Sequence, residues 1–578
     1  MPLLAANRRA LANRFPEVLE TLDSVAPVAP PATTSVEEPT AFVDEVARSA
    51  RQLLVLTGLP GPATVAALLA RAPRECICWC LEPAPAPLAA RLAIEDHSAW
   101  LSDPRVFLSV GVPTAPELQR LNRELAWCDR ARALPLASRV PGHEQVWKAS
   151  LGATLGRVQQ RWQNVFTDLT LSPVRWENTC ANLPSFLSAP SVEALAGAFA
   201  GAPLVVVAAG PSLDDALPFL RRVAPHALIV TGNTSFRALA AHGISPHLTV
   251  TTDPFPATDL GYEGQPLGTT HLVSPVFAYP GVHRRFAGRL FGMPDESSLL
   301  RRLRTAAGRP PAPALLGEAT VSTTVINLAA YLGCTRVVLV GQDFAVADDG
   351  RTHASDTFYT DLGLNRQDNE KVQRLPGTTR PAVTVPTRHV WYLRAVEERI
   401  AHTPSIRYLN TSHRGAAIAG APFADYESAA KELITGSPRD FSAEIAALHT
   451  RHTPPAVPAA FTAELAHART AMAEAFRLSL AAALTAELAT ATPTPSARRN
   501  FEIATKHFEQ WKATHPADRQ LLFEGRTKPE IFEAEKRRIR IPAEAKEPQL
   551  LAATELAWAY SEGAGSVYRS LLPLELRT

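Results

Sequence analysis

The chain has 578 residues, and its 58 Lys and Arg against 56 Asp and Glu give a net charge of only +2 at pH 7. This length is too great for one hydrophobic core and predicts about three domains. Hydrophobic residues make up 46% and charged residues 20%, the balance of an ordinary folded protein. The near-neutral charge excludes binding of nucleic acid or an anionic membrane through overall charge, so we expect neither partner.

The start of the chain and its cysteines favour a reducing compartment. The first residues, MPLLAANRRALANRF, lack the long apolar run of a secretory signal, and no stretch reaches the roughly 18 apolar residues that span a bilayer. Cys76, Cys78 and Cys80 alternate along one predicted strand, where they are either metal ligands or small buried hydrophobes. The second reading is favoured because no matching Cys or His pair follows. We therefore expect a cytoplasmic protein with no metal site.

The N-terminal part predicts a helix, a linker and a first α/β domain. Residues 1–40 contain the Pro-rich stretch VAPVAPPATTSVEEP, which is typical of a linker after a helix. In residues 41–195, strands at 52–58, up to Glu82 and at 103–111 alternate with helices before a helical connector. This order predicts a Rossmann-like domain. The loop TGLPG lacks the G-x-G-x-x-G spacing, so whether the domain binds a nucleotide near Glu82 stays open.

The middle of the chain, residues 196–435, predicts a second doubly wound domain. Near-continuous Val, Leu and Ile runs separated by helical segments are typical of a parallel sheet that is buried on both faces. The predicted strands begin or lie at 203–213, 227–233, 248–253, 271–275, 336–343 and 406–412.

The C-terminal part, residues 436–578, predicts a domain of helices only. The run AAFTAELAHARTAMAEAFRLSLAAALTAELA is helical by composition and period, and TPTPS breaks it at Pro493 and Pro495. The predicted fold class is therefore α/β, with two Rossmann-like doubly wound domains followed by an all-helical domain.

Four loops of the middle domain carry the candidate site, because parallel sheets bind ligands at the carboxyl ends of their strands. In the first loop, Gly210, Pro211 and Ser212 form a tight turn from strand to helix. Glycine lets the backbone approach a ligand, and Ser212 can cap the helix that starts at Leu213. The N–H groups at that helix start favour a phosphate or a carboxylate.

The second and third loops contribute an amide and a carboxylate. Asn233 and Thr234 follow a strand and a glycine, and the Asn233 amide either suits a base or ribose edge or caps the next helix. Asp253 precedes Pro254, which ends the strand. This carboxylate can hold ribose hydroxyls, a metal ion or a second substrate, or it can serve only the turn.

The fourth loop region is the longest. Ser322 and Thr323 open a helix whose hydroxyl and N–H groups form another anion cradle. The strand RVVLV then delivers Gly341, Gln342 and Asp343 to the same edge of the sheet. His353 follows in the polar loop ADDGRTHASD, where it is either a surface histidine or part of the site.

Taken in order, these motifs resemble the motility-associated factor (Maf) flagellin glycosyltransferases. The resemblance rests on WENTCANLP, PLVVVAAGPSLDD, the strand end at Asn233, GISPHLTVTTDP, LVGQDFA with GRTHA, and YLNTSHRGAAIAG, and it covers most of residues 50–430. It implies transfer of a nonulosonic acid, such as a pseudaminic, legionaminic or other sialic-acid-like sugar, from a CMP-activated donor to Ser or Thr of flagellin. That reaction supports flagellum assembly and motility.

The middle domain is also similar, more distantly, to metal-independent bacterial sialyltransferases. In those enzymes the matching G-P-S turn, strand-end Asn and Ser/Thr-rich helix start hold CMP. This chain departs from their pattern at Ala209, where they have Asn. Their phosphate-stabilising tyrosines fall at Ala345 and His353, and their base histidine falls at 383–387, before His389.

The resemblance implies a division of roles. His353, Asp343 and Asp253 are the candidate catalytic groups, and neither a metal nor a cofactor is required. The C-terminal helices are expected to bind flagellin. Two alternatives stay open: a 6-hydroxymethylpterin diphosphokinase-like enzyme that uses ATP and Mg²⁺, and a flagellin-binding assembly factor without catalysis.

Overall fold

The computed structural model divides the chain into two compact units. The first comprises Met1–Thr170 with Phe532–Leu556, and the second Leu171–Ile531 with Ala557–Thr578. The residue boundaries expected for the domains stay predictions. The structure describes residues 3–25, 52–57, 62–71, 76–82, 84–111, 130–135, 167–317, 319–366, 371–524, 528–540, 546–572 and 574.

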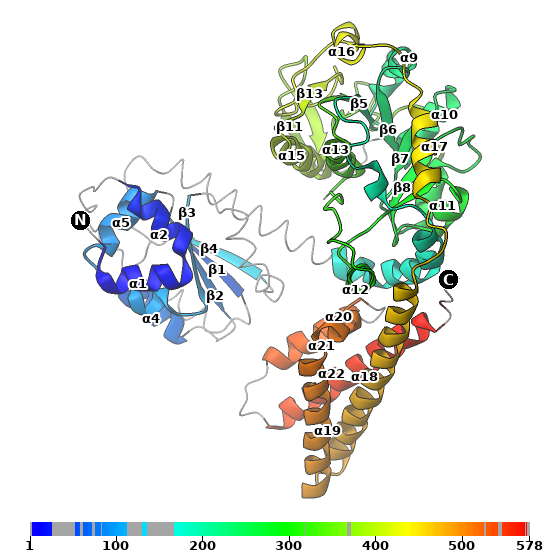
Figure 1. Cartoon of the computed structure of the whole chain (residues 1–578). Helices are drawn as coiled ribbons and strands as arrows, with labels where there is room; N and C mark the ends of the chain where they lie inside the picture. The colour runs from blue at the N-terminus through cyan, green and yellow to red at the C-terminus, as the bar shows by residue number, and fades with distance from the viewer. Residues whose placement is uncertain are drawn as a thin grey trace. The chain divides into compact units, whose positions relative to one another are not determined.

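The first unit is built on a parallel sheet with the strand order β3-β2-β1-β4. This sheet confirms the predicted N-terminal Rossmann-like fold; β4 was not predicted. The strands are β1 (Gln52–Thr57), β2 (Ile77–Glu82), β3 (Val106–Val110) and β4 (Arg130–Pro135). The helices of residues 3–111 are α1 (Ala5–Arg14), α2 (Pro16–Asp23), α4 (Pro62–Arg71), α5 (Pro85–Leu92) and α6 (Ser98–Leu101), drawn in blue in Figure 1.

The alternating cysteines are part of this unit's core. Cys76, Cys78 and Cys80 are buried among leucines and valines of the sheet and its helices. Burial raises the pKa of the Cys78 thiol to about 12, so it stays protonated at neutral pH. No group of three or more His, Cys, Asp or Glu side chains that could hold a metal ion occurs in the described parts of the chain. The prediction of small buried hydrophobes is confirmed.

The second unit contains a seven-stranded parallel sheet with the order β13-β10-β5-β6-β7-β8-β9. From β5 the chain winds outward to β9 and then returns to the other side of β5, so the switch point lies between β5 and β10 (Figure 1). The six predicted strands are confirmed, and β9 is an addition. The bounds are β5 (Pro203–Val207), β6 (Leu228–Gly232), β7 (Leu248–Val250), β8 (His271–Pro275), β9 (Leu290–Met293), β10 (Arg336–Val340) and β13 (Arg407–Asn410).

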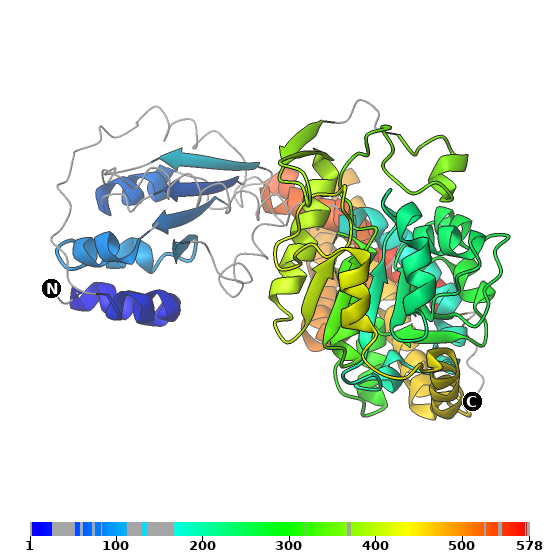
Figure 2. The same cartoon turned by 90° about the horizontal axis from the view of Figure 1, so that it is seen from above.

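Helices cover both faces of this sheet, as Figure 2 shows from above. In β5, Leu204 and Val206 pack on the side of α13 and α15, whereas Val205 and Val207 pack on the side of α9 and α16. Each strand residue is therefore buried, which explains the unbroken apolar runs of the sequence. The elements are η1 (Val192–Leu195), α9 (Leu213–Val223), α10 (Asn233–Ala241), η2 (Pro256–Gly261), α11 (Pro280–Arg285), α12 (Ser298–Ala306), α13 (Val321–Tyr331), α14 (Phe358–Asp361), β11 (Val372–Leu375), β12 (Val383–Pro386), α15 (Thr387–Ala401) and α16 (Tyr426–Leu433).

After α16 the described chain is helical, as predicted. The longest helix, α18, packs against α19 as an antiparallel hairpin (Figure 1). Buried alanines recur every seven residues along α18, at Ala468, Ala475, Ala482 and Ala489, and such small side chains let helices approach closely. The break lies at the predicted prolines. The bounds are α17 (Phe441–His452), α18 (Ala459–Ala491), α19 (Pro495–Thr514), α20 (Pro516–Leu522), α21 (Lys528–Arg540) and α22 (Lys546–Leu571).

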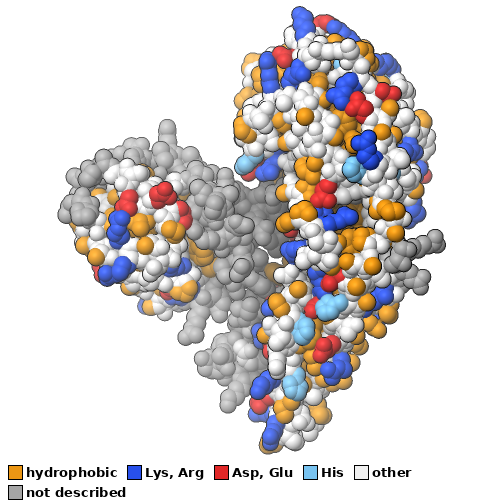
Figure 3. Space-filling model, viewed as in Figure 1, with side chains coloured by type: hydrophobic (Ala, Val, Ile, Leu, Met, Phe, Trp, Pro, Cys, Tyr) orange, Lys and Arg blue, Asp and Glu red, His pale blue; other side chains and the backbone are white. Residues whose placement is uncertain are grey.

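None of the described helices is both long enough and apolar enough to cross a bilayer. On the face of the second unit seen in Figure 3, basic and acidic side chains are interspersed, in keeping with the balanced composition.

A connector helix over residues 167–188 is tied to the sheet by two asparagines. Asn182 donates both amide hydrogens, to the carbonyls of Val276 and Ala278, at 2.7 Å each. Asn178 donates in the same way to the carbonyls of Pro254 and Phe277. These buried bonds fix the loops that follow β7 and β8, and those loops border the ligand edge of the sheet.

Replacing Asn182 by alanine should destabilise the second unit. The change leaves two buried carbonyls without their amide donors and creates a cavity, so the free energy of unfolding should fall by roughly 2–4 kcal/mol. Denaturant titration measures this loss. The exposed Ser188, on the same helix, provides the control: Ser188→Ala should change the value by no more than about 0.5 kcal/mol. Equal effects of the two variants would contradict the role given to Asn182.

Candidate functional site

A cavity of about 280 Å³ opens at the switch point between β5 and β10. This is the place where doubly wound sheets bind ligands, and the volume is close to the lower end of small-molecule pockets. The cavity is lined by the loops after β5, β6, β7 and β10 and by α10, α13, α14 and α15. Predicted site residues in its wall are Gly210, Asn233, Thr234, Asp253, Ser322, Gly341, Gln342, Asp343 and His353; Pro211, Ser212 and Thr323 lie outside the lining.

The turn after β5 is held by Asp343. The backbone N–H of Ser212 and its hydroxyl both donate to Asp343 Oδ2, at 3.1 and 2.7 Å. The prediction that the Ser212 side chain caps α9 is therefore wrong, and the carboxylate at this helix start belongs to the protein itself. Asp343 already occupies the anion position at this helix start.

The Asp343 carboxyl is buried, and its pKa is raised. Burial raises the pKa of its carboxyl to about 6, although the Ser212 bonds and Arg414 oppose the shift. Among the described residues, its Oδ1 has no hydrogen-bond partner. Gly210 packs so closely against this carboxylate that a Cβ there would overlap Asp343 Oδ2 and Gly341 O. The G-P-S turn therefore requires glycine for a packing reason.

Helix α10 begins at Asn233, and its N-terminal end lines the cavity. Gly232 takes the N-cap position, so the alternative that Asn233 caps this helix is wrong. The Asn233 amide nitrogen donates to the Thr258 carbonyl at 3.3 Å, and the residue is almost buried in the cavity wall. Thr234 follows in the first turn and also lines the cavity. This helix start thus offers N–H groups and side-chain polar groups to a ligand.

Helix α13 supplies a second helix start. Ser322 lies in its first turn, and its hydroxyl accepts a hydrogen bond from the Gln342 amide at 2.6 Å. That bond links the helix to the loop after β10. The Thr323 hydroxyl instead donates backward to the Thr320 carbonyl at 2.5 Å, and Thr323 is fully buried. Of the two hydroxyl residues predicted at this helix start, only Ser322 faces the cavity.

Asp253 lies at the exposed rim of the cavity, after β7. Nearby protein raises the pKa of its carboxyl by desolvation, and Arg175 opposes that shift. Its backbone carbonyl accepts a hydrogen bond from Tyr279 N–H at 3.0 Å. The side chain is placed to meet a ligand that enters the cavity.

His353 is fixed in the wall of the cavity as a neutral imidazole. Its ring stacks on Tyr359 with centroids 4.1 Å apart, and its backbone N–H donates to Asn365 Oδ1 at 2.7 Å. Burial, with help from His389 and Arg388, lowers the pKa of His353 to about 4. A neutral imidazole can donate a hydrogen bond to a phosphate. To bind the phosphate as a cation, the ring would need a higher pKa.

Among the lining residues that were not predicted are His389, Tyr359 and Tyr392. His389 and Tyr392 come from α15, and Tyr359 comes from α14. His389 Nδ1 lies 3.1 Å from the Phe344 carbonyl, a contact that requires Nδ1 to donate. This contact fixes the orientation of the imidazole ring in the cavity wall. Because these residues lie within helices, a search along strand ends did not single them out.

Several residues that line this cavity have backbone conformations with positive φ. Among the described non-glycine residues, only Ala319 and Phe344 have positive φ, at 67° and 55°, and both line the cavity. Gly341, another lining residue, has φ of 68°. Residues held in this region cost free energy and are typical of functional sites.

The lining that the structure describes contains two carboxylates and no Lys or Arg. A phosphate here would meet the starts of α10 and α13, polar side chains and the neutral His353, which stabilise negative charge without a metal. Mg²⁺ prefers several oxygen ligands, but the Asp343 carboxylate already accepts two hydrogen bonds from Ser212. The arrangement therefore fits a phosphate ester better than a metal–nucleotide complex.

Comparisons with known proteins agree with this architecture. The sequence profile of a family described as 6-hydroxymethylpterin diphosphokinase MptE-like matches residues 177–349, well under half of the chain. No curated protein matches the chain. The structure of a Maf glycosyltransferase from Magnetospirillum magneticum AMB-1 is similar over 99% of this chain and 97% of its own, with a TM-score of 0.61 and 16% identity. This likeness shows the fold, and the predicted resemblance to Maf proteins is confirmed at that level.

Proposed function

We propose that this protein is a glycosyltransferase that moves a nonulosonic acid from a CMP-activated donor to Ser or Thr of flagellin. The observation that carries the proposal is the convergence of two helix starts, Asn233 and two histidines on one cavity at the switch point. The whole-length structural likeness to a Maf glycosyltransferase supports it.

The donor phosphate would lie at the starts of α10 and α13. Departure of CMP leaves an oxocarbenium-like sugar and increases the negative charge on the phosphate. The N–H groups of the first turns favour that charge, and His353 donates a hydrogen bond as a neutral ring. The Tyr359 hydroxyl stays protonated because burial raises its pKa, so it can donate as well.

The acceptor hydroxyl needs a base, and His389 is the best placed of the histidines. Its Nδ1 donates to Phe344 O, which orients the ring, and we assign Nε2 as the atom that takes the proton. In the reaction the bond between the anomeric carbon and the phosphate oxygen breaks, and its electron pair leaves with CMP. The acceptor oxygen bonds to the same carbon, and its proton passes to His389 Nε2. Asp253, at the rim, is the alternative base.

Asn233→Ala tests the donor pocket. Loss of the amide should weaken CMP binding about tenfold, the effect of one good hydrogen bond. Calorimetric titration of CMP into the purified variant measures it. Asn500→Ala changes an exposed asparagine on α19 and should bind CMP as the natural protein does. Unchanged affinity in the Asn233 variant would mean that CMP does not bind in this cavity.

The diphosphokinase alternative rests on the family profile, and EDTA distinguishes it. A kinase requires Mg²⁺ for the transferred phosphates, whereas the proposed transfer continues in EDTA. Because Asp343 is engaged by Ser212, the cavity has one exposed carboxylate for a metal, and the kinase is not favoured. The other alternative, an assembly factor without catalysis, predicts flagellin binding without CMP binding.

We further propose that the C-terminal helices bind the acceptor. Leu484 and Leu488 on α18 and Ile503 on α19 are exposed large apolar side chains on the α18–α19 hairpin. Apolar side chains in such positions suit contact with a helical protein partner.

A further inference from the structure

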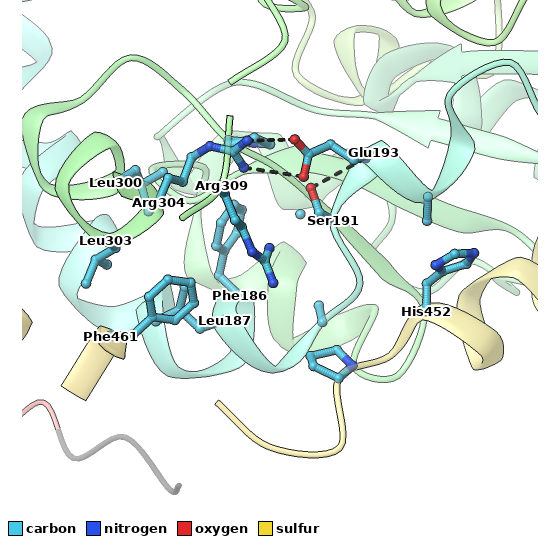
Figure 4. Close-up of a pocket in the computed structure, with 15 residues that line it drawn as sticks. Phe186, Leu187, Ser191, Glu193, Leu300, Leu303, Arg304, Arg309, His452 and Phe461 are labelled. Carbon is cyan, nitrogen blue, oxygen red and sulfur yellow. Dashed lines mark hydrogen bonds and ion pairs between the residues drawn. The ribbon is translucent and has the colours of Figure 1, made fainter. Parts of the chain in front are cut away.

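A second cavity, of about 330 Å³, lies apart from the CMP pocket and shares no lining residue with it. Figure 4 shows its walls. One side is formed by the connector helix, the segment around η1 and α12; the other is formed by the chain between α17 and α18 and by Phe461 at the start of α18. A ligand in this cavity would therefore contact both the sheet domain and the helical region.

The walls combine apolar and polar surface in about equal measure. Phe186, Leu300, Leu303 and Phe461 are buried core residues whose edges border the cavity, and Leu187 is half-buried. At roughly 30 Å³ per water, the volume corresponds to about eleven waters, or a ligand of roughly a dozen non-hydrogen atoms. The apolar part of the wall favours an aromatic or branched aliphatic group, and the polar part favours a ligand that also carries a polar group.

The charged groups of the cavity leave one positive charge uncompensated. Arg304 is paired with Glu193 at 2.6 Å and also donates to the carbonyl of Pro310. Arg309, in contrast, has no carboxylate partner within the described chain; its guanidinium lies 5.7 Å from the centre of the Phe461 ring. In Figure 4 this guanidinium projects into the cavity. His452 and the Ser191 hydroxyl add polar contacts at the wall.

We propose that this second cavity is a binding site for a small apolar carboxylate, with the apolar group against Phe186, Leu303 and Phe461 and the carboxylate on Arg309. A guanidinium on an aromatic face is prepared for such a ligand, because its N–H edges remain directed outward and can donate to both carboxylate oxygens. The ligand would join α12 to the start of α18. The inference does not depend on the function proposed for the CMP pocket.

Indole-3-acetate is a suitable probe, and its neutral amide, indole-3-acetamide, is the matched comparison. Ligand-observed NMR titration of the full chain should show the acid binding with a dissociation constant near about 1 mM, as expected for a ligand of this size. The amide should bind about tenfold more weakly, because it lacks the charge that Arg309 attracts. Arg309→Gln should remove this preference, and Leu187→Glu should remove binding of the acid by repulsion. Arg284→Gln, an exposed arginine on α11, is the control and should preserve both affinities.

The proposal would be overturned by absence of binding of the acid, by equal binding of acid and amide, or by an unchanged preference in the Arg309 variant. Competition separates the two cavities. CMP should not displace the probe, and Asn233→Ala should leave probe binding unchanged; displacement by CMP would place the probe in the first cavity and contradict the second site. If CMP fails to bind while the probe still binds, the proposed function is contradicted and the second site is not.

Discussion

His389→Ala should lower the rate of glycosyl transfer by about a hundredfold or more while changing CMP affinity little. Removing a general base typically costs between about 10² and 10⁴ in rate, and His389 lies in the cavity wall with its ring oriented by the Phe344 carbonyl. The measurement is turnover, followed as CMP release in the presence of flagellin, together with calorimetric CMP affinity.

Added imidazole makes this prediction specific. A small imidazole can enter the space left by the side chain and take the acceptor proton, so it should restore part of the lost rate. His402→Ala changes an exposed histidine that follows the same helix and should behave as the natural protein does. His353→Ala should lower turnover without imidazole rescue, because the lost interaction is a hydrogen bond to the phosphate rather than a proton acceptor. Full turnover in the His389 variant would remove His389 from the mechanism and leave Asp253 as the base.

Gly210→Ala should weaken CMP binding about a hundredfold. The added Cβ would overlap both Asp343 Oδ2 and Gly341 O, so the turn after β5 and the strained loop after β10 must move apart. Overpacking of this kind lowers the free energy of unfolding by roughly 1–3 kcal/mol. The same displacement moves the wall of the donor cavity away from the ligand. Calorimetry gives the affinity, and denaturant titration gives the accompanying loss of stability.

Gly436 provides the comparison for this variant. A Cβ at Gly436 meets nothing within 4 Å, so Gly436→Ala should leave both stability and CMP binding close to their natural values. If Gly210→Ala folds and still binds CMP normally, the G-P-S turn is not part of the donor site. If it does not fold, circular dichroism will report that directly, and Asn233→Ala then carries the test of the cavity.

Much of the second unit followed from the sequence, because buried parallel strands have a strong compositional signature. The runs PLVVV and RVVLV predicted β5 and β10, and the rule that strands deliver polar residues to one edge predicted that Asn233, Asp253 and His353 would meet. These residues are far apart in sequence, yet they line one cavity.

The missed elements have weaker signatures. β4 reads RARALP, in which the alternating apolar residues are alanines with little β propensity, and β11 reads VQRL, which has neither an apolar run nor alternation. β9 is four residues long and contains a glycine. The use of Ser212 by Asp343 could not be predicted either. It depends on β10 returning to lie beside β5, a pairing that sequence patterns do not specify.

The cavity residues His389, Tyr359 and Tyr392 were missed for a different reason. They reach the site from α14 and α15, so the search along strand ends passed over them. The resemblance to sialyltransferases suggested tyrosines and a histidine, but it aligned them with Ala345, His353 and residues 383–387. Packing in three dimensions supplies the same kinds of side chain from other positions.

Intact-mass analysis of flagellin tests the central claim most directly. Flagellin is co-expressed with this protein in cells that make a CMP-activated nonulosonic acid, and its mass is compared with that of flagellin made beside an Asn233→Ala and Gly210→Ala double variant. We expect added masses of whole nonulosonic acid residues with the natural protein and few or none with the variant. Unmodified flagellin in both samples, with the donor sugar present, would contradict it.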